Sequence, residues 1–406
     1  MDKMKTIMLL GAGIEQVTAI QIAKEMGLRV IVVDQNPKAP GLKIADVGIN
    51  ADIKDVDKLI EIGKKYKIDG VMTHGVEIPV VVAKVARALN LPGIDPEIAE
   101  RATNKLKRIQ CFKKNNVPTS RFFSASSIEE AKIVAENLGF PVVFKPIDNS
   151  GARGVVKISS IADIEKYYKY SLSFSKQKTI LVEEYLQGFE ISTESVIYND
   201  KIYTPCIADR NYSDKKSFDP FFIEDGGELP TRLSKEELDK VLHVVEKAIK
   251  ALGLTWGVAK GDILIDSEGP KVIEMAARTS GGRFCSLKVP LSNGANILYP
   301  LIEMAVNIEP NLDWLVPKFT KGVAERFIFP DPGKIVSISG ISEARKIEGV
   351  YELTIDDVIK VGNIVPRIEN HTDRHGYVVA IGKTREQAIK IAEKVIKKIK
   401  IEVERV

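Results

Sequence analysis

The first hundred residues alternate short apolar runs with amphipathic stretches. β-rich runs occupy residues 5–10, 30–34 and 70–73, and helical patterns begin near Gln16, Asp55 and Pro79. Strands that alternate with helices in this way predict a parallel sheet covered by helices on both faces. The sequence therefore predicts an α/β domain at the start of the chain.

The rest of the chain mixes strand and helix patterns, which predicts α+β structure. Between residues 104 and 318 the clearest are strands at 179–185 and 190–198 and a long helix at 235–252. After residue 318, strand patterns at 322–329 and 376–381 precede a helix at 384–399, where apolar residues recur at helical spacing. We expect boundaries near residues 103 and 318.

Composition narrows the class of protein. A chain of 406 residues, 44% of them hydrophobic, is longer than a single hydrophobic core usually accommodates, so two to four subdomains are expected. A net charge of +4 does not indicate a nucleic-acid partner. The apolar stretch that ends at Gly11 is too short to span a membrane and lacks a cleavage site, so we expect a cytoplasmic protein. Cys111, Cys206 and Cys285 lack metal-type spacing and are expected to be reduced thiols.

A partial dinucleotide fingerprint follows the first strand. Gly11 and Gly13 precede a helix, and Asp34 closes the second strand, but Gln16 replaces the third glycine. A tight strand-to-helix turn explains these residues equally well. The pattern keeps an NAD(P)-dependent oxidoreductase open as an alternative.

The most informative stretch is a lysine followed by a glycine-rich loop. A strand delivers Lys145, and a loop containing Ser150, Gly151, Arg153 and Gly154 returns into a strand at 155–158. Glycines let backbone N–H groups surround a phosphate, while lysine and arginine supply charge and hydrogen-bond donors. No Gly-Lys-Ser/Thr follows, so this is not a Walker loop, and an ordinary hairpin turn remains the alternative.

Acidic residues follow downstream at strand ends. The strand near 181–186 ends in acids and leads to a second strand, an order that suits adenine at the strand edge and an acid at the ribose hydroxyls. Asp262 and Glu274 lie on two strands joined by a turn at 266–269, and Mg²⁺ favours one or two carboxylates plus nucleotide phosphates. Arg278, with the glycines after it, is placed to hold a γ-phosphate or an acyl phosphate.

Together these residues resemble the ATP-grasp superfamily, in the branch of biotin carboxylase, carbamoyl-phosphate synthetase, purine-pathway ligases and L-amino-acid ligases. The resemblance implies a Rossmann-like pre-ATP-grasp domain at 1–103, an ATP-grasp nucleotide-binding domain at 104–318 with a mobile lobe at about 118–188, and a C-terminal α+β domain at 319–406.

The same resemblance implies roles for individual residues. Lys105 and Lys145 would be the phosphate-side lysines, residues 150–154 the mobile phosphate loop, and Arg278 the catalytic arginine together with Lys145. Asp262 and Glu274 would hold Mg²⁺, with Mn²⁺ as the alternative ion. The residues around adenosine would be Glu183, Glu184, Leu186 and Glu190.

The implied activity is that of a ligase that joins a carboxylate to an amine through an acyl phosphate and releases ADP and phosphate. Ala276 stands where many members carry a metal-binding asparagine, which leaves the second metal open and is similar to the amino-acid-ligase-like members. The implied partners are a small-molecule carboxylate and amine, with a homodimer as the implied assembly. An ATP-dependent carboxylase of the purine-pathway or biotin-carboxylase type and a catalytically silent ATP-binding protein remain alternatives.

Substrate contacts are expected from several polar residues. His74 and Glu77 follow a parallel strand, at the edge where open α/β sheets bind ligands. Arg210 and the segment 218–228 suggest a cover over the substrate, although a surface loop explains the segment equally well, and Arg283 follows the glycine turn. His371 or Arg374 is expected near the substrate pocket rather than in a zinc site.

Overall fold

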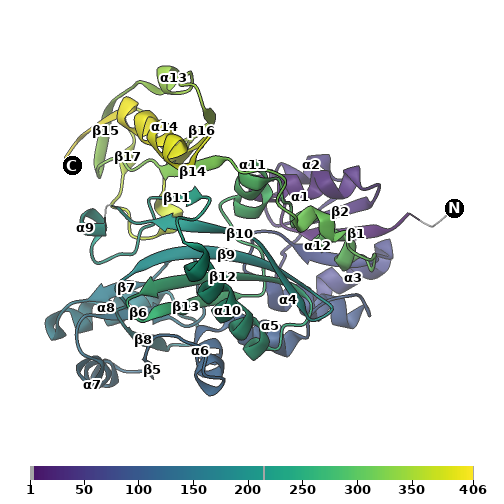
Figure 1. Cartoon of the computed structure of the whole chain (residues 1–406), viewed down its shortest axis with the longest axis horizontal. Coiled ribbons are helices and arrows are strands. Elements are labelled where there is room, and N and C mark those ends of the chain that lie inside the picture. The colour runs from purple at the N-terminus through teal and green to yellow at the C-terminus, as the bar shows by residue number, and fades with distance from the viewer. Residues whose placement is uncertain (1–3, 214, 406) are drawn as a thin grey trace.

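A computed structural model describes residues 4–213 and 215–405 (Figure 1). Its N-terminal part is a parallel sheet in the order β3-β2-β1-β4. The strands are β1 (Thr6–Leu10), β2 (Arg29–Asp34), β3 (Val47–Asn50) and β4 (Gly70–Thr73), and the helices are α1 (Ile14–Glu25), α2 (Gly41–Ile44), α3 (Val56–Tyr66) and α4 (Pro79–Ala88). Every residue of β1 is buried, as expected for a parallel strand covered on both faces. The predicted α/β architecture is confirmed.

The lobe that was predicted at about 118–188 contains a four-stranded antiparallel sheet in the order β5-β8-β6-β7. Its strands are β5 (Phe122–Ala125), β6 (Val142–Pro146), β7 (Val156–Ile158) and β8 (Ile180–Glu184), and its helices are α7 (Ile128–Leu138), η1 (Ile161–Asp163) and α8 (Ile164–Ser173). Ser127 caps α7 by accepting a hydrogen bond from the backbone N–H of Glu130. Phe144 is fully buried in the core of this lobe.

An eight-stranded sheet forms the centre, in the order β13-β12-β9-β10-β11-β14-β18-β16. These strands are β9 (Phe189–Tyr198), β10 (Lys201–Asn211), β11 (Gly226–Leu229), β12 (Gly257–Asp266), β13 (Gly269–Ala276), β14 (Gly322–Phe327), β16 (Val350–Ile355) and β18 (Gly376–Gly382). Because β11 pairs with β14, the sheet continues across residue 318, where a domain boundary was expected. That division of the chain stays a prediction.

Helices and a small sheet complete the fold. A capping box at Ser234 and a left-handed Gly253 bound α10 (Lys235–Leu252) at its two ends. The small sheet has the order β17-β15-β19, with β15 (Gly333–Ser339), β17 (Ile364–Val365) and β19 (Lys400–Glu404). The other helices are α5 (Pro96–Thr103), α6 (Lys105–Lys114), α9 (Lys215–Phe218), η2 (Phe284–Lys288), α11 (Val289–Asn293), α12 (Leu298–Ala305), η3 (Leu312–Leu315), α13 (Ile341–Ala344), η4 (His371–Asp373) and α14 (Arg385–Lys398).

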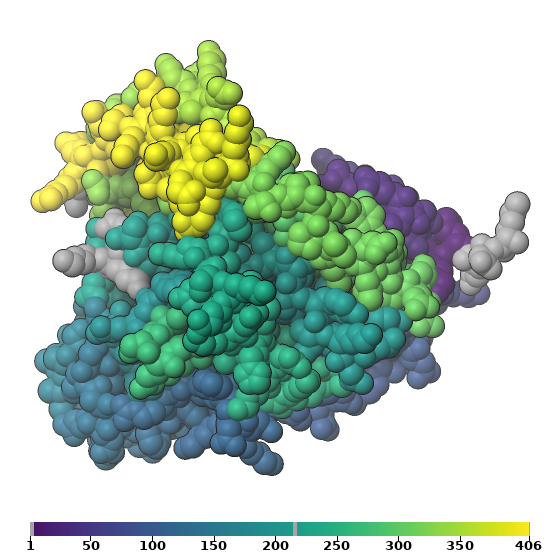
Figure 2. Space-filling view, viewed as in Figure 1, coloured from purple at the N-terminus to yellow at the C-terminus, as the bar shows by residue number. Residues whose placement is uncertain are grey.

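The space-filling view shows how these parts lie together. The yellow C-terminal residues lie against the teal residues of the central part, and the blue lobe lies below them (Figure 2). Within residues 4–213 and 215–405, no helix combines the length and the apolar character that a membrane span requires.

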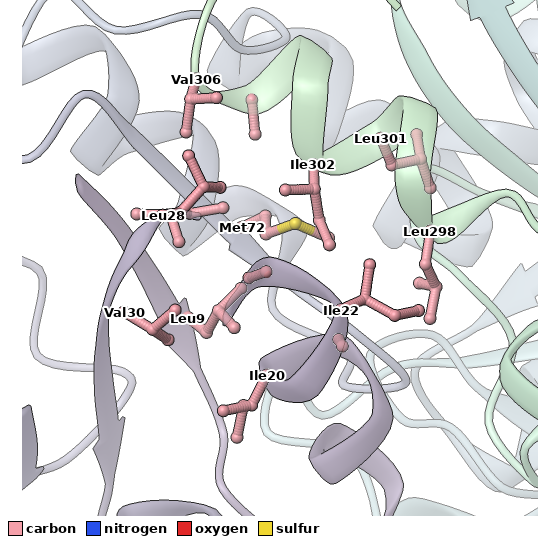
Figure 3. Packing of buried hydrophobic residues seen from close by; sticks show 14 of the residues in the cluster. Leu9, Ile20, Ile22, Leu28, Val30, Met72, Leu298, Leu301, Ile302 and Val306 are labelled. Atoms are coloured by element: carbon pink, nitrogen blue, oxygen red, sulfur yellow. The ribbon is translucent and has the colours of Figure 1, made fainter. Parts of the chain in front are cut away.

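Helix α12 anchors the N-terminal sheet to the rest of the chain. Leu298, Leu301 and Ile302 of α12 pack against Leu9 and Met72 of the parallel sheet (Figure 3). The close approach explains the glycine that opens β4, because a Cβ atom at that position would lie 2.2 Å from the carbonyl oxygen of Ala305. Segments more than two hundred residues apart therefore share one core.

Replacing Ile302 by alanine is expected to lower the free energy of unfolding by about 2–5 kcal/mol, because Ile302 is fully buried in this core and its loss leaves a cavity. Urea-induced unfolding would measure the change. Ile308→Ala is the matched control, since Ile308 is 40% exposed, and its effect should stay within about 0.5 kcal/mol. Equal effects of the two substitutions would contradict this account of the interface.

Candidate active site

One cavity, of about 510 Å³, collects most of the predicted site residues. Its lining comes from the lobe, the central sheet, the loop after β4 and the C-terminal segment around η4. The predicted residues that line it are Glu77, Lys105, Lys145, Ser150, Gly151, Arg153, Glu183, Glu184, Leu186, Glu190, Arg210, Asp262, Glu274, Arg278, His371 and Arg374. Residues spread over two hundred positions therefore meet in one place.

Lys145 extends from β6 beside the neighbouring strand β8. Its Nζ lies 3.0 Å from Glu183 Oε2, and the same carboxylate oxygen accepts a hydrogen bond from Ser120 Oγ at 2.7 Å. The Lys145 side chain is 14% exposed, and the exposed part borders the cavity. Antiparallel pairing of β6 with β8 sets this geometry, because it places Val143 opposite Glu183 and Lys145 opposite Leu181.

Lys105 opens helix α6 and lies on the same side of the cavity. Its ammonium donates to the carbonyl oxygen of Asn149, at the start of the glycine loop. Burial lowers the pKa of Lys105, while the negative charge of Glu274 acts in the opposite direction. The two predicted phosphate-side lysines therefore lie at the same cavity, one at the base of the loop and one on the adjoining strand.

The glycine loop adopts unusual backbone dihedrals. Gly151, Ala152 and Gly154 have φ angles of 69°, 59° and 74°. Arg153 Nε donates to the carbonyl oxygen of Ser150, which ties the turn together. Gly154 does not line the cavity; a Cβ atom there would lie 2.9 Å from the ring of Phe174, so this glycine serves close packing.

The part of the cavity next to β8 is suited to a flat apolar ring. Glu184, Tyr185 and Leu186 follow one another along its edge, and Glu184 is held by Arg121 at 2.6 Å. The apolar walls comprise Val143, Leu181, Phe222, Leu264 and Ile273. The sequence interpretation missed these walls, because isolated apolar residues on five segments give no common signal.

Glu190 faces a basic residue. Its Oε2 accepts hydrogen bonds from the hydroxyl of Tyr212 at 3.1 Å and from Arg210 Nη1 at 3.5 Å. Arg210 also lies 3.0 Å from Glu224 and 3.1 Å from Asp262. Arg210 therefore joins the predicted ribose acid to the predicted metal-binding pair.

Asp262 and Glu274 are direct cross-strand partners on β12 and β13. Asp262 accepts a hydrogen bond from Ser192 Oγ at 2.9 Å and pairs with Lys260. Burial alone would raise the pKa values of both carboxyls, but nearby positive charges outweigh it and hold both below their usual range. Among these positive charges, Lys260 acts most strongly on each carboxyl.

This pair suits Mg²⁺ better than a metal that needs many protein ligands. Two ionised carboxylates are what Mg²⁺ takes from a protein when phosphates complete its coordination. Among the described residues no group of three or more His, Cys, Asp or Glu side chains converges on a metal site. Ala276 is fully buried and offers no side-chain oxygen.

Arg278 brings the N-terminal domain to the cavity. Its Nε donates to Glu77 from the loop after β4, and its Nη1 donates to the carbonyl oxygen of Thr279 at 3.0 Å. Burial by itself would lower the pKa of Arg278. The negative charges of Glu77 and Glu274 outweigh burial and raise this pKa above its usual value, so the guanidinium stays charged. A fixed positive charge thus lies beside the two carboxylates.

Two predicted substrate residues lie outside the cavity lining. His74 is 1% exposed, and its Nδ1 lies 2.9 Å from Thr279 Oγ1, so it stabilises the turn after Arg278 by a buried hydrogen bond. Burial lowers the pKa of His74 to about 4, which keeps the ring neutral. The Arg283 guanidinium is bound instead by the Glu352 carboxylate at 2.6 Å and the Tyr377 hydroxyl at 3.1 Å, outside the cavity lining. The prediction of direct substrate contact by these two residues is corrected accordingly.

The turn after β1 has its backbone donors occupied. The Ala12 N–H donates to Asp34 Oδ2 at 2.6 Å, and the Gly13 N–H donates to Gln16 Oε1 at 2.9 Å. In a dinucleotide site these donors would face a pyrophosphate and the acid would bind a ribose. The geometry favours the tight-turn interpretation over the oxidoreductase alternative.

Three family models match the chain in succession. Residues 7–78 match the PylC-like N-terminal domain, residues 102–282 match the ATP-grasp domain, and residues 326–404 match the L-amino acid ligase C-terminal domain 2.

Several known proteins are similar to this chain, each over a different share of its length. The uncharacterized protein y4rH of Sinorhizobium fredii is 28% identical over 86% of this chain and 72% of its own length. The formate-dependent phosphoribosylglycinamide formyltransferase of a Synechococcus species is 31% identical over 45% of this chain, which is 47% of that protein. The crystal structure of L-amino acid ligase from Bacillus licheniformis has a TM-score of 0.82, 20% identity and full coverage of both chains.

Proposed function

Because this chain carries an ATP-grasp domain between a PylC-like N-terminal domain and an L-amino acid ligase C-terminal domain, we propose that it is an ATP-dependent ligase that forms a carbon–nitrogen bond between a small-molecule carboxylate and an amine. One observation carries the proposal: Lys105, Lys145 and Arg278 border the same cavity as the ionised pair Asp262 and Glu274. This charge arrangement suits a polyphosphate bound with divalent cations.

We assign the nucleotide to the part of the cavity between the lobe and the central sheet. The apolar walls beside Tyr185 and Leu186 would enclose adenine, and Glu190 would accept from the ribose once Arg210 turns to another anion. The glycine loop and the two lysines would contact the phosphates. Asp262 and Glu274 would hold Mg²⁺, which neutralises phosphate charge when bound.

The proposed reaction has two steps. An oxygen of the substrate carboxylate attacks the γ-phosphorus of ATP, the bond to the β-phosphate oxygen breaks, and ADP leaves with that electron pair. The amine nitrogen then attacks the acyl carbon, phosphate leaves, and the nitrogen loses a proton. Arg278 is placed to balance charge on the transferred phosphoryl group, so the site works mainly by positioning and electrostatics.

The acyl phosphate needs protection from water. Ser150, Gly151, Ala152 and Arg153 of the loop line the cavity, and the carbonyl oxygen of Gly151 accepts a hydrogen bond from the His371 N–H at 3.2 Å. A loop held between the lobe and the C-terminal segment would shield the intermediate. The domain limits at 103 and 318 and the lobe at about 118–188 belong to the same proposal.

The test is a coupled-product screen with the purified full-length chain. Pairs of carboxylates and amines are incubated with Mg·ATP, and ADP, phosphate and the amide are measured together. ADP release that needs both substrates and matches the amide formed supports the proposal. Nucleotide binding without turnover across a broad screen would support the silent protein instead, and bicarbonate-dependent ADP release would support the carboxylase.

Replacing Lys145 by alanine is expected to weaken Mg·ATP binding about 10- to 100-fold, the usual effect of losing one charge-assisted hydrogen bond. Isothermal titration calorimetry with Mg·ADP and a non-hydrolysable ATP analogue would measure it. Lys169→Ala is the matched control, since Lys169 belongs to the same lobe but is 65% exposed and pairs with Glu165. Unchanged nucleotide affinity in Lys145→Ala would remove the lysine from the phosphate site.

A further inference from the structure

Arg374 is a basic residue of the cavity that the nucleotide assignment leaves unused. It follows η4 and lines the cavity with its neighbours His371 and Thr372. Its side chain is 18% exposed, its Nε donates to the His371 carbonyl oxygen at 2.9 Å, and its guanidinium lies 3.7 Å from the ring centroid of Phe327. The backbone bond and the aromatic ring therefore hold the guanidinium in one orientation.

The protein's own acids do not neutralise this arginine. The nearest carboxylate, Glu224, is 3.8 Å from Arg374 Nη1 but only 3.0 Å from Arg210, which brings the pKa of Glu224 to about 2 against the effect of burial. Glu325 is paired with Lys288 at 2.6 Å. Buried Nη1 of Arg374 has no hydrogen-bond partner. Burial accordingly lowers the pKa of Arg374 even though Glu224 and Glu325 act to raise it.

Glu224 and Arg210 link Arg374 to the predicted metal-binding pair: Glu224 lies 3.8 Å from Arg374 and 3.0 Å from Arg210, and Arg210 lies 3.1 Å from Asp262. The charges that act most on Arg374 are those of Glu224, Glu325 and Arg210. The charges that act most on Glu274 are those of Lys260, Lys105, Arg108 and Arg278. Because Glu224 and Arg210 lie between Arg374 and Asp262, an anion at Arg374 would occupy another part of the cavity than the phosphates expected beside Glu274.

The location also fits a reacting substrate. The segment that carries Arg374 contacts the glycine loop through the hydrogen bond from His371 to Gly151. The terminal phosphate is expected beside this loop, and a substrate must come close to that phosphate to react. Phe284, Phe327 and Leu229 add an apolar surface to the same cavity.

We propose that Arg374 binds an anionic group, a carboxylate or a phosphate, of the substrate other than ATP, and that it thereby selects substrates that carry such a group. This proposal rests on the proposed function, because the ligase reaction defines which molecule is the substrate. A substrate that lacks such an anionic group would leave the positive charge of the guanidinium without a counter-charge in a largely enclosed site. Bidentate pairing with the planar guanidinium is the interaction that would give this selectivity.

The test measures how tightly probe anions bind to the full-length protein saturated with Mg·ADP. Acetate, propionate, 3-phenylpropionate and inorganic phosphate are titrated by calorimetry, with propionamide as the uncharged counterpart. At least one anion is expected to bind the wild type, and Arg374→Ala should weaken it about 10- to 100-fold. Arg374→Lys should recover part of the affinity, because it keeps the charge and loses the planar fork.

Arg367→Ala is the matched control for this experiment. Arg367 lies on the same segment but outside the cavity lining, where it donates to the carbonyl oxygen of Asp219. It should leave anion affinity unchanged, and Mg·ADP affinity should be equal in all variants. The proposal is overturned if no probe anion binds the wild type, if Arg374→Ala binds anions normally, or if Arg374→Ala loses Mg·ADP affinity instead.

The same titrations separate this proposal from the proposed function. Failure of the wild type to bind Mg·ADP would count against the ligase assignment. Anion binding that depends on Arg374 would then still be measured without nucleotide and would stand by itself. Phosphate binding without carboxylate binding would identify a phosphorylated substrate, and the reverse would identify a carboxylate.

Discussion

Glu274→Gln should lower Mg²⁺-dependent turnover by about 10³-fold while the protein stays folded. Removing the carboxylate charge takes away one of two candidate metal ligands, and metal stabilisation of a phosphoryl transition state is worth several kcal/mol, at about 1.4 kcal/mol for each tenfold change in rate. The amide of glutamine keeps the size and part of the hydrogen bonding of the side chain. Steady-state ADP release at varied Mg²⁺ concentration would measure both the rate and the metal requirement.

Glu268→Gln is the matched control for this variant. Glu268 lies in the turn of the same hairpin, is 76% exposed and pairs with Lys271 at 2.6 Å, far enough from the lining to leave turnover unchanged. A Glu274→Gln variant that keeps wild-type turnover and Mg²⁺ dependence would refute the assignment of Glu274 as a ligand. Equal losses in the two variants would point to damage of the hairpin instead.

Arg278→Ala is the second large effect, with an expected loss of about 10³-fold or more in kcat, as found when an arginine stabilises transferred phosphoryl charge. The guanidinium is 12% exposed and held by Glu77, so it is positioned before any ligand binds. Nucleotide affinity should change much less than kcat, because charge develops on the transferred group only in the transition state. Single-turnover kinetics together with Mg·ADP titration would separate the two quantities.

Two further variants make the Arg278 result interpretable. Arg278→Lys keeps the charge but loses the planar fork, so it should recover only part of the rate. Arg87→Ala should behave as wild type, since Arg87 is 64% exposed on α4 and 3.9 Å from Asp95. A loss of nucleotide affinity as large as the loss of kcat would reassign Arg278 to ground-state binding.

The local elements of the site were predictable because each is encoded within one short stretch. Alternating apolar runs and helices indicated the parallel sheet, and the confirmed hairpin of β12 and β13 followed from two strands and a four-residue turn. Asp262 lies four residues before Asp266 and Glu274 lies five residues after Gly269, so a regular hairpin would set Asp262 opposite Ile273. A register shift between Asp262 and Ile263 instead brings the two carboxylates opposite each other, and the sequence interpretation did not include that shift. The lysine and glycine loop next to β6 are likewise contiguous in sequence.

Lys260 could have been predicted from the sequence as a site residue, but the interpretation did not include it. It lies two residues before Asp262 on the same strand, so both side chains must point to the same face of the sheet. The structure places Lys260 in the cavity, in an ion pair with Asp262. Period-two spacing next to a proposed metal ligand would have identified it.

The sequence alone determined which elements form and which short motifs carry charge, because helix periodicity, strand alternation and tight turns depend on neighbours a few residues apart. Only the tertiary structure decided which distant residues meet. The pairing of Arg278 with Glu77 joins positions 201 residues apart, and β14 joins the central sheet from beyond the predicted boundary. Packing against other segments turned His74 into a buried support for the turn after Arg278. Such contacts follow from how whole layers pack against one another, and no local pattern of residues encodes that.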